Sequence, residues 1–243
     1  MRPGIVLRSC LFAAVQILIT PPYSIAALCT FPLPALTRYR FVRGWARLML
    51  ELAERICGIR YRVLGAEHIP PYPCVVLSKH QSAWETIAFQ VIFPPQSQVV
   101  KRELLWIPFF GWGLAMVSPI AINRSSGTRA LKQMIEQGRD RIKRGFWVIV
   151  YPEGTRAVPG TRGKYQAGGA AIAVHAGAPV VPVAHNAGEY WRRHAFLKYP
   201  GTVTVSIGRA IDSHGMKAEA LTRQAEDWIE SEMPRLGRSH GQA

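Results

Sequence analysis

Acidic residues are scarce in this sequence. Its 243 residues contain 15 Asp and Glu against 30 Lys and Arg, which gives a formal net charge of +15 at pH 7. A protein this basic is expected to bind anionic partners, such as nucleic acid, a phospholipid surface or a phosphorylated substrate. Composition alone does not choose among these three.

Charged residues of either sign are also few. They make up 19% of the chain, whereas hydrophobic residues make up 49%. Disordered chains combine low hydrophobicity with high charge, so this composition excludes a largely disordered protein. The length is sufficient for one sizeable domain with its own core, or at most two small ones.

The four cysteines are scattered, at Cys10, Cys29, Cys57 and Cys74. They show neither a C-x-x-C pair nor a Cys/His spacing typical of metal ligands, so no disulfide framework and no metal site is expected. Free cysteine is readily buried, and we expect these four to act as small apolar residues in a reducing compartment.

A long uncharged stretch lies near the amino terminus, with no Asp, Glu, Lys, Arg or His between Arg8 and Arg38. Pro21 and Pro22 divide it into two parts, each shorter than the roughly 20 residues that a straight spanning helix needs. A helical hairpin that dips into one leaflet, with the proline pair at its bend, is the favoured interpretation. A single kinked span, a cleaved signal peptide and a buried helix pair are the alternatives.

Arginine flanks this apolar stretch. Residues 1–62 hold nine Arg and two Glu, and four of the arginines follow the stretch closely, within residues 38–47. Clustered arginines resist translocation, so both ends are expected on the cytoplasmic side. The pattern favours an anionic membrane surface over nucleic acid. Residues 39–57 then follow as a predicted amphipathic helix.

Beyond residue 58, short apolar runs alternate with helical segments, which predicts an α/β domain with a largely parallel central sheet flanked by helices. The expected organisation is an apolar two-helix membrane-binding motif at 1–58, an α/β domain at 59–236 and a frayed tail at 237–243. Strands are predicted at 59–64, 74–78, 99–100, 146–151, 180–184 and 203–207, and helices at 82–92, 126–143, 167–176 and 216–232.

His80 follows a predicted strand and precedes a predicted helix, a junction where side chains face an open crevice at the sheet edge. Glu85 lies five residues later. Residues five apart on a regular helix do not meet, but a carboxylate in the first turn can reach back to an imidazole in the preceding loop. Such a pair can act as a base and its orienting partner, and an ordinary surface or capping pair is the alternative.

Residues 151–156, Tyr-Pro-Glu-Gly-Thr-Arg, also follow a predicted strand. Gly154 allows close approach of a ligand, Arg156 offers donors that match phosphate oxygens, and Glu153 can accept from hydroxyls or hold an arginine. A simple turn is the alternative. Lys101 and Arg124 lie at further element boundaries where anions commonly bind.

Together these motifs, in this order, resemble the 1-acylglycerol-3-phosphate acyltransferase family of the lysophospholipid acyltransferases. The resemblance covers roughly residues 60–210, and the apolar amino-terminal region is similar to the membrane-binding helix pair of bacterial members. The motifs are His80-x4-Glu85 and residues 101–112, 122–124, 151–156 and 178–184.

The resemblance implies roles by position. His80 would deprotonate the acceptor hydroxyl, and Glu85 stands where the family usually has Asp, one methylene longer. The residues that match substrate-binding positions are Lys101, Arg124, Glu153, Gly154, Thr155 and Arg156. One departure is Gln166, which stands where the family often has a lysine.

The implied reaction transfers a fatty acyl group from acyl-CoA or acyl-carrier protein to the sn-2 hydroxyl of 1-acylglycerol 3-phosphate (lysophosphatidic acid), forming phosphatidic acid. It needs no metal or other cofactor, because the thioester is already activated. The expected location is the cytoplasmic face of a bacterial inner membrane, with the phospholipid bilayer as a partner and no nucleic acid. Alternatives are a different lyso-lipid acceptor, or a non-catalytic protein that binds anionic lipid.

Overall fold

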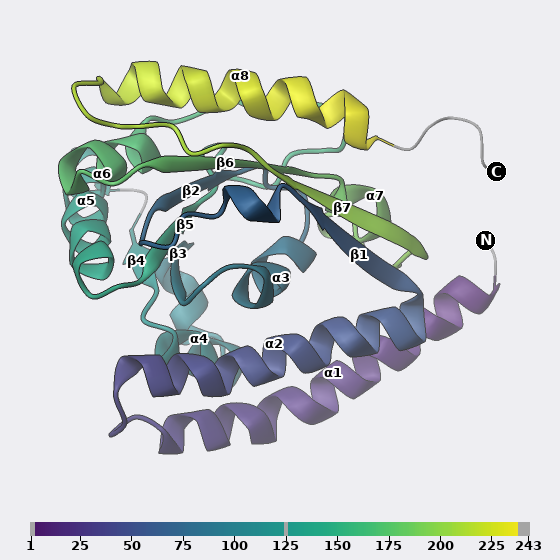
Figure 1. Cartoon of the computed structure of the whole chain (residues 1–243). Coiled ribbons are helices and arrows are strands. Elements are labelled where there is room, and N and C mark those ends of the chain that lie inside the picture. The colour runs from purple at the N-terminus through teal and green to yellow at the C-terminus, as the bar shows by residue number, and fades with distance from the viewer. Residues whose placement is uncertain (1–2, 124–125, 238–243) are drawn as a thin grey trace.

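The protein folds around a seven-stranded sheet in the order β1-β7-β6-β2-β5-β3-β4 (Figure 1). The computed structural model describes residues 3–123 and 126–237. Only the β6/β7 pair is antiparallel among the paired strands, so the predicted largely parallel sheet is confirmed. The strands are β1 (Ile59–Leu64), β2 (Val75–Ser78), β3 (Gln96–Lys101), β4 (Ile120–Ile122), β5 (Trp147–Val150), β6 (Val180–His185) and β7 (Gly201–Ile207).

Helices cover both faces of the sheet (Figure 1). The α-helices are α1 (Pro3–Cys29), α2 (Ala35–Cys57), α3 (Trp84–Ile92), α4 (Phe110–Met116), α5 (Gly127–Lys143), α6 (Gly168–Ala176), α7 (Ala187–Tyr190) and α8 (Ala218–Leu236), and two 3-10 turns are η1 (Ala66–His68) and η2 (Arg102–Trp106). The strand β4 has only three residues, too short a run for the sequence pattern to predict.

Strand β2 shows how the core is divided between the two faces. Val76, with Cys74 just before the strand, packs in a cluster with residues of α1, α2 and α3, whereas Val75 and Leu77 pack with residues of α5, α6 and α8. Successive side chains of a strand point to opposite faces, so a central strand needs apolar residues at every position. This explains the continuous apolar run before His80.

The two amino-terminal helices form a hairpin, but the bend predicted at Pro21 and Pro22 is wrong. Both prolines lie inside α1, which continues to Cys29, and the chain turns at residues 30–34. Proline in a helix removes backbone hydrogen bonds without always ending it, and long apolar helices tolerate it. The turn comes instead where Pro32 and Pro34 follow the helix end, with Pro34 immediately before α2.

Helix α1 contributes directly to the core of the α/β domain. Phe12 is 1% exposed and its ring lies edge-on to that of Trp191, with centroids 5.4 Å apart. The Ser9 hydroxyl accepts a hydrogen bond from the backbone N–H of Lys198 at 3.0 Å. The division into domains at residue 58 stays a prediction, and this boundary falls between α2 and β1.

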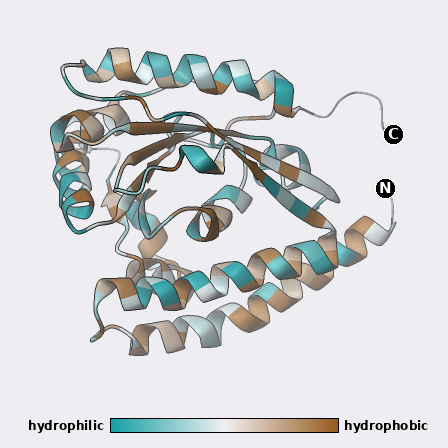
Figure 2. Cartoon of the chain, viewed as in Figure 1, coloured by the Kyte–Doolittle hydropathy of each residue, from teal (hydrophilic) through white to brown (hydrophobic). Residues whose placement is uncertain are grey.

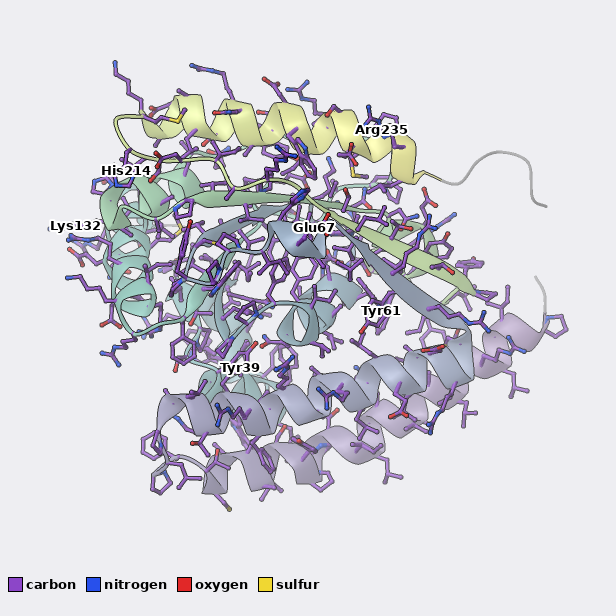
Figure 3. All side chains as sticks on the ribbon, in the orientation of Figure 1. Tyr39, Tyr61, Glu67, Lys132, His214 and Arg235 are labelled. Carbon is purple, nitrogen blue, oxygen red and sulfur yellow. The ribbon has the colours of Figure 1, made fainter. Side chains whose placement is uncertain are left out.

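Helix α2 is joined to α3 by two side chains. Tyr39, labelled in Figure 3, is buried and its hydroxyl donates to the Gln90 carbonyl oxygen at 3.2 Å. The Arg43 guanidinium donates to the Val91 carbonyl oxygen at 2.9 Å. These bonds satisfy carbonyl groups of the last turn of α3, which have no partner within their own helix. The hairpin is therefore fixed to the helix that carries Glu85.

The outer face of α1 is apolar and exposed. Figure 2 shows this helix as mostly hydrophobic along its length, and Ile17 and Leu18 are among its exposed side chains. The helix is long and apolar enough to cross a membrane. An exposed apolar helix face, followed in the chain by the arginine-rich helix α2, indicates association with a membrane.

Two apolar positions on α1, the buried Phe12 and the exposed Leu18, separate its structural and membrane-facing roles. We expect Phe12→Ala to lower the melting temperature of the detergent-solubilised protein, because removing a buried aromatic ring costs about 3–5 kcal/mol. The matched control Leu18→Ala changes a side chain that is 75% exposed, so it should leave the melting temperature unchanged and weaken vesicle binding. Equal melting temperatures for Phe12→Ala and the wild type would contradict the packing described.

Candidate active site

The candidate site lies at the carboxyl ends of β2 and β5, which are parallel neighbours. His80 comes two residues after β2, and the motif at 151–156 starts immediately after β5. The backbone N–H of Ala157 donates to the His80 carbonyl oxygen at 2.7 Å. Because carboxyl ends of parallel strands meet at one edge, the sheet brings together two motifs that are about 70 residues apart in sequence.

One oxygen of Glu85 accepts three hydrogen bonds. Its Oε1 lies 2.8 Å from His80 Nδ1, 2.9 Å from the Gln81 backbone nitrogen and 2.8 Å from the Ser82 backbone nitrogen. The Ser82 hydroxyl in turn accepts from the Trp84 backbone N–H at 3.0 Å. Ser82 and Glu85 have the three-residue spacing of a helix capping box, and the bond from the Ser82 N–H to the Glu85 carboxylate is one of its two bonds. The dyad and the capping pair, which the sequence left as alternatives, therefore share one carboxylate.

The environment of Glu85 keeps it ionised. Burial of the carboxyl works to raise its pKa, but the hydrogen bonds from His80 and from the Ser82 N–H favour the charged form, and the net effect is a lowered pKa. An ionised carboxylate is only an acceptor, so Nδ1 of His80 must carry the proton that they share. The extra methylene of Glu relative to Asp therefore does not prevent contact.

The His80 ring is held between Glu85 and Tyr151. The His80 and Tyr151 rings are stacked, with centroids 4.1 Å apart and an angle of 20° between their planes. The His80 side chain is 15% exposed, whereas that of Glu85 is fully buried. With Nδ1 bound to Glu85, Nε2 is the nitrogen available as an acceptor for a proton.

A second histidine, which the sequence did not single out, supports the same loop. His185, the last residue of β6, is fully buried and its Nε2 donates to the Lys79 carbonyl oxygen at 2.8 Å, while its Nδ1 accepts from the Ala187 N–H at 3.3 Å. Burial lowers the pKa of His185, so this imidazole stays neutral. Its position 4.0 Å from Glu85 Oε1 places a neutral ring beside the carboxylate.

Lys79, beside His80, is the centre of a buried ion-pair network. Its Nζ lies 2.7 Å from Glu153 Oε1 and 2.7 Å from Glu230 Oε1, and donates to the Thr161 carbonyl oxygen at 3.0 Å. The Tyr165 hydroxyl donates to the same Glu230 oxygen at 2.8 Å. The network ties the loop after β2 to the loop after β5 and to α8.

This network determines where Glu153 lies. Its side chain is 1% exposed, and burial raises the pKa of its carboxyl against the opposing effect of Lys79. The Glu153 carboxylate is buried against Lys79. We therefore expect Glu153 to affect substrate binding through the position of its loop. Gly154 in that loop has φ +69°, a backbone conformation that glycine adopts without strain.

The remaining predicted binding residues are spread around the site. Thr155 is exposed, and Arg156 lines an apolar cavity of about 140 Å³ beside α1, α2, α3 and α4. Lys101 is the last residue of β3 and is exposed, two strands from β2 in the sheet. Arg124 lies outside the described residues. The substrate-binding roles of these residues stay predictions.

Lys79→Met tests the ion-pair network. The substitution leaves two carboxylates without their shared cation, and breaking a buried ion pair costs about 3–5 kcal/mol, so we expect a clear fall in melting temperature. A second change, Glu153→Gln in the Lys79→Met background, should recover part of the loss. Lys132→Met, at an exposed lysine of α5 labelled in Figure 3, is the matched control and should change little. A melting temperature for Lys79→Met equal to that of the control would contradict the network.

The chain is similar in sequence and in structure to known acyltransferases. The Acyltransferase family profile matches residues 60–186. A 1-acyl-sn-glycerol-3-phosphate acyltransferase from Pseudomonas aeruginosa is 50% identical over 208 residues, which cover 84% of this chain and 81% of that protein. A human 1-acyl-sn-glycerol-3-phosphate acyltransferase alpha is 35% identical over 139 residues, covering 56% of this chain and 49% of the human protein.

The fold is also found in a solved structure. The crystal structure of the 1-acyl-sn-glycerophosphate acyltransferase PlsC from Thermotoga maritima matches with a TM-score of 0.80 and 21% identity, over 98% of each chain. That match extends to the amino-terminal helices, which lie outside the matched family region. The chain belongs to the acyltransferase family, among the 1-acyl-sn-glycerol-3-phosphate acyltransferases.

Proposed function

We propose that this protein transfers a fatty acyl group from a thioester donor to the sn-2 hydroxyl of 1-acylglycerol 3-phosphate, forming phosphatidic acid. The observation that carries the proposal is the His80–Glu85 pair, 2.8 Å apart, with the second ring nitrogen available for a substrate. The relative from Pseudomonas aeruginosa, 50% identical and named for this activity, supports the choice of acceptor. Another lyso-lipid acceptor is the alternative.

The proposed mechanism is direct transfer. Nε2 of His80 takes the proton of the acceptor hydroxyl as its oxygen attacks the thioester carbonyl carbon. The tetrahedral intermediate then collapses, the carbon–sulfur bond breaks, and the departing sulfur takes the proton back from the imidazolium. Ionised Glu85 stabilises that imidazolium and keeps the ring in one tautomer.

Backbone groups near His80 restrict where the oxyanion can be stabilised. The N–H groups of Gln81 and Ser82 bond to Glu85, and that of Trp84 bonds to the Ser82 hydroxyl. These donors are already used, so the developing negative charge must be stabilised by other groups, such as bound substrate or the side chains around it.

We place part of the acyl chain in the apolar cavity. It is lined by residues of α1 and α2, including Tyr23 and Trp45, by Leu104 and Phe110 near α4, and by Arg156. An acyl chain in this cavity would lie against the helices that associate with the membrane, so a lipid substrate could enter from the bilayer. The predicted location on the cytoplasmic face of a bacterial inner membrane is consistent with the arginines of α2.

Substitution of the dyad tests the proposal. We expect His80→Ala to lower kcat by about 10²–10⁴-fold, the contribution of a general base, and Glu85→Gln to cause a large loss as well, because the imidazole loses its charged partner. Activity is measured as thiol release from acyl-CoA with lysophosphatidic acid in micelles, next to a panel of other lyso-lipids.

His214→Ala is the matched control for these variants, because His214 is exposed and distant in the fold, where Figure 3 labels it near α6. It should retain wild-type turnover. Wild-type turnover in folded His80→Ala protein would overturn the mechanism, and a clear preference for another lyso-lipid would replace the proposed acceptor.

A further inference from the structure

A second, larger hollow adjoins the loop at residues 79–83, which carries His80 and is called the catalytic loop below. It has a volume of about 880 Å³ and is formed by the loop after β5, the segment around α7 and the carboxyl-terminal half of α8. Figure 1 shows α7 on the same side of the molecule as the carboxyl-terminal end of α8. We call it the arginine groove, after Arg162, Arg192 and Arg193 in its lining.

The arginine groove starts at the catalytic loop. Lys79 and Gln81, the two neighbours of His80, both line it. Close packing of Gly188 joins the groove wall to this loop, since a Cβ on Gly188 would lie 2.8 Å from the Gln81 Cβ and 2.9 Å from the Pro159 Cγ. A ligand in the groove would therefore lie next to the backbone of His80.

The groove presents positive charge. Glu230 in its wall is already paired with Lys79 and bonded by the Tyr165 hydroxyl. Arg162 is paired with Glu226 at 2.7 Å. By contrast, Arg192 and Arg193 have no carboxylate within 4.0 Å in residues 3–123 and 126–237. Glu189 is the other acidic residue of the lining. The lining therefore contains more basic residues than acidic ones.

Both of these arginines are positioned by other groups. The Arg192 guanidinium lies over the Tyr199 ring, 5.5 Å from its centroid. One nitrogen of Arg193 donates to the carbonyl oxygen of Arg156. A guanidinium has five N–H donors, so each keeps donors for an anion. Such planar, preorganised donors match phosphate oxygens well.

Arg156 connects the two hollows. Its side chain lines the apolar cavity, and its carbonyl oxygen bonds to Arg193 in the arginine groove. The His80 carbonyl oxygen accepts from the N–H of Ala157, which stands in the chain between Arg156 of the apolar cavity and Val158 of the arginine groove. A thioester donor has the same three parts in the same order, an apolar chain, the reacting carbonyl and a phosphorylated arm.

We propose that the arginine groove binds the phosphate end of the acyl donor, an acyl-phosphopantetheine thioester. Arg192 and Arg193 are the residues that bind this phosphate. The inference rests on the proposed function and adds the site of the second substrate. The residues predicted from the resemblance to bind the acceptor are Lys101, Arg124 and residues 153–156. Lys101 and residues 153–156 do not line the arginine groove, so the two anionic substrates would occupy different sites. Acyl-CoA and acyl-carrier protein share this phosphate.

Steady-state kinetics of Arg192→Ala tests the groove. With palmitoyl-CoA as donor we expect the donor KM to rise about tenfold, the effect of one lost charge-assisted contact, with little change in kcat. With palmitoyl-pantetheine, which lacks the phosphate, KM should equal that of the wild type. Arg192→Lys should recover part of the loss. Arg193→Ala should act similarly, with its melting temperature measured because Arg193 also holds the Arg156 loop.

Arg223→Ala is the matched control, since it removes an exposed arginine of α8 that does not line the groove. Its donor KM should not change. The groove assignment is overturned if Arg192→Ala raises the KM of lysophosphatidic acid instead, raises the KM of both donors equally, or changes neither.

A parallel series with palmitoyl-carrier protein separates the two sources of the phosphate. The donor with the higher wild-type kcat/KM is the physiological class, and Arg192→Ala should impair whichever one is used. An effect confined to the carrier protein, with palmitoyl-CoA used well and unaffected, would mean that the groove contacts protein surface and would contradict phosphate binding. Failure of the wild type to acylate any lyso-lipid would instead refute the proposed function itself.

Discussion

The site depends on one oxygen atom, Oε1 of Glu85. It accepts hydrogen bonds from the His80 ring and from two backbone N–H groups, all within 2.9 Å. The same bonds fix the loop that carries His80, directly before α3, and orient its imidazole. A buried carboxylate needs these donors to stay ionised. The protonation state of Glu85 therefore depends on the same hydrogen bonds as the local fold.

The rest of the molecule supports this loop from several sides. His185 holds it from β6, Lys79 joins it to α8 and to the 151–156 motif, and Tyr39 joins α3 to the amino-terminal hairpin. The hairpin is therefore both a membrane-facing surface and a part of the core. This arrangement joins the loop of His80 to the helices whose exposed apolar surface indicates membrane association.

The sequence predicted the sheet well because its central strands are buried on both faces and show as continuous apolar runs. It predicted the contact between His80 and Glu85 because capping geometry is local. The predicted position of the hairpin bend was wrong, because the two adjacent prolines lie inside the apolar helix α1 and do not end it. The partners of Lys79, and the positions of Arg192 and Arg193 beside the catalytic loop, could not be predicted, because they depend on contacts between residues about 70 to 150 positions apart.

The central claim is that Glu85 holds His80 with its proton on Nδ1 and leaves Nε2 free. Nitrogen-15 NMR of the histidine side chains in detergent-solubilised protein at neutral pH tests it directly, with His80→Ala used to assign the signals. The account predicts a protonated Nδ1 and an unprotonated Nε2 for His80, and loss of this pattern in Glu85→Gln. A His80 ring protonated on Nε2 alone in the wild type would contradict it.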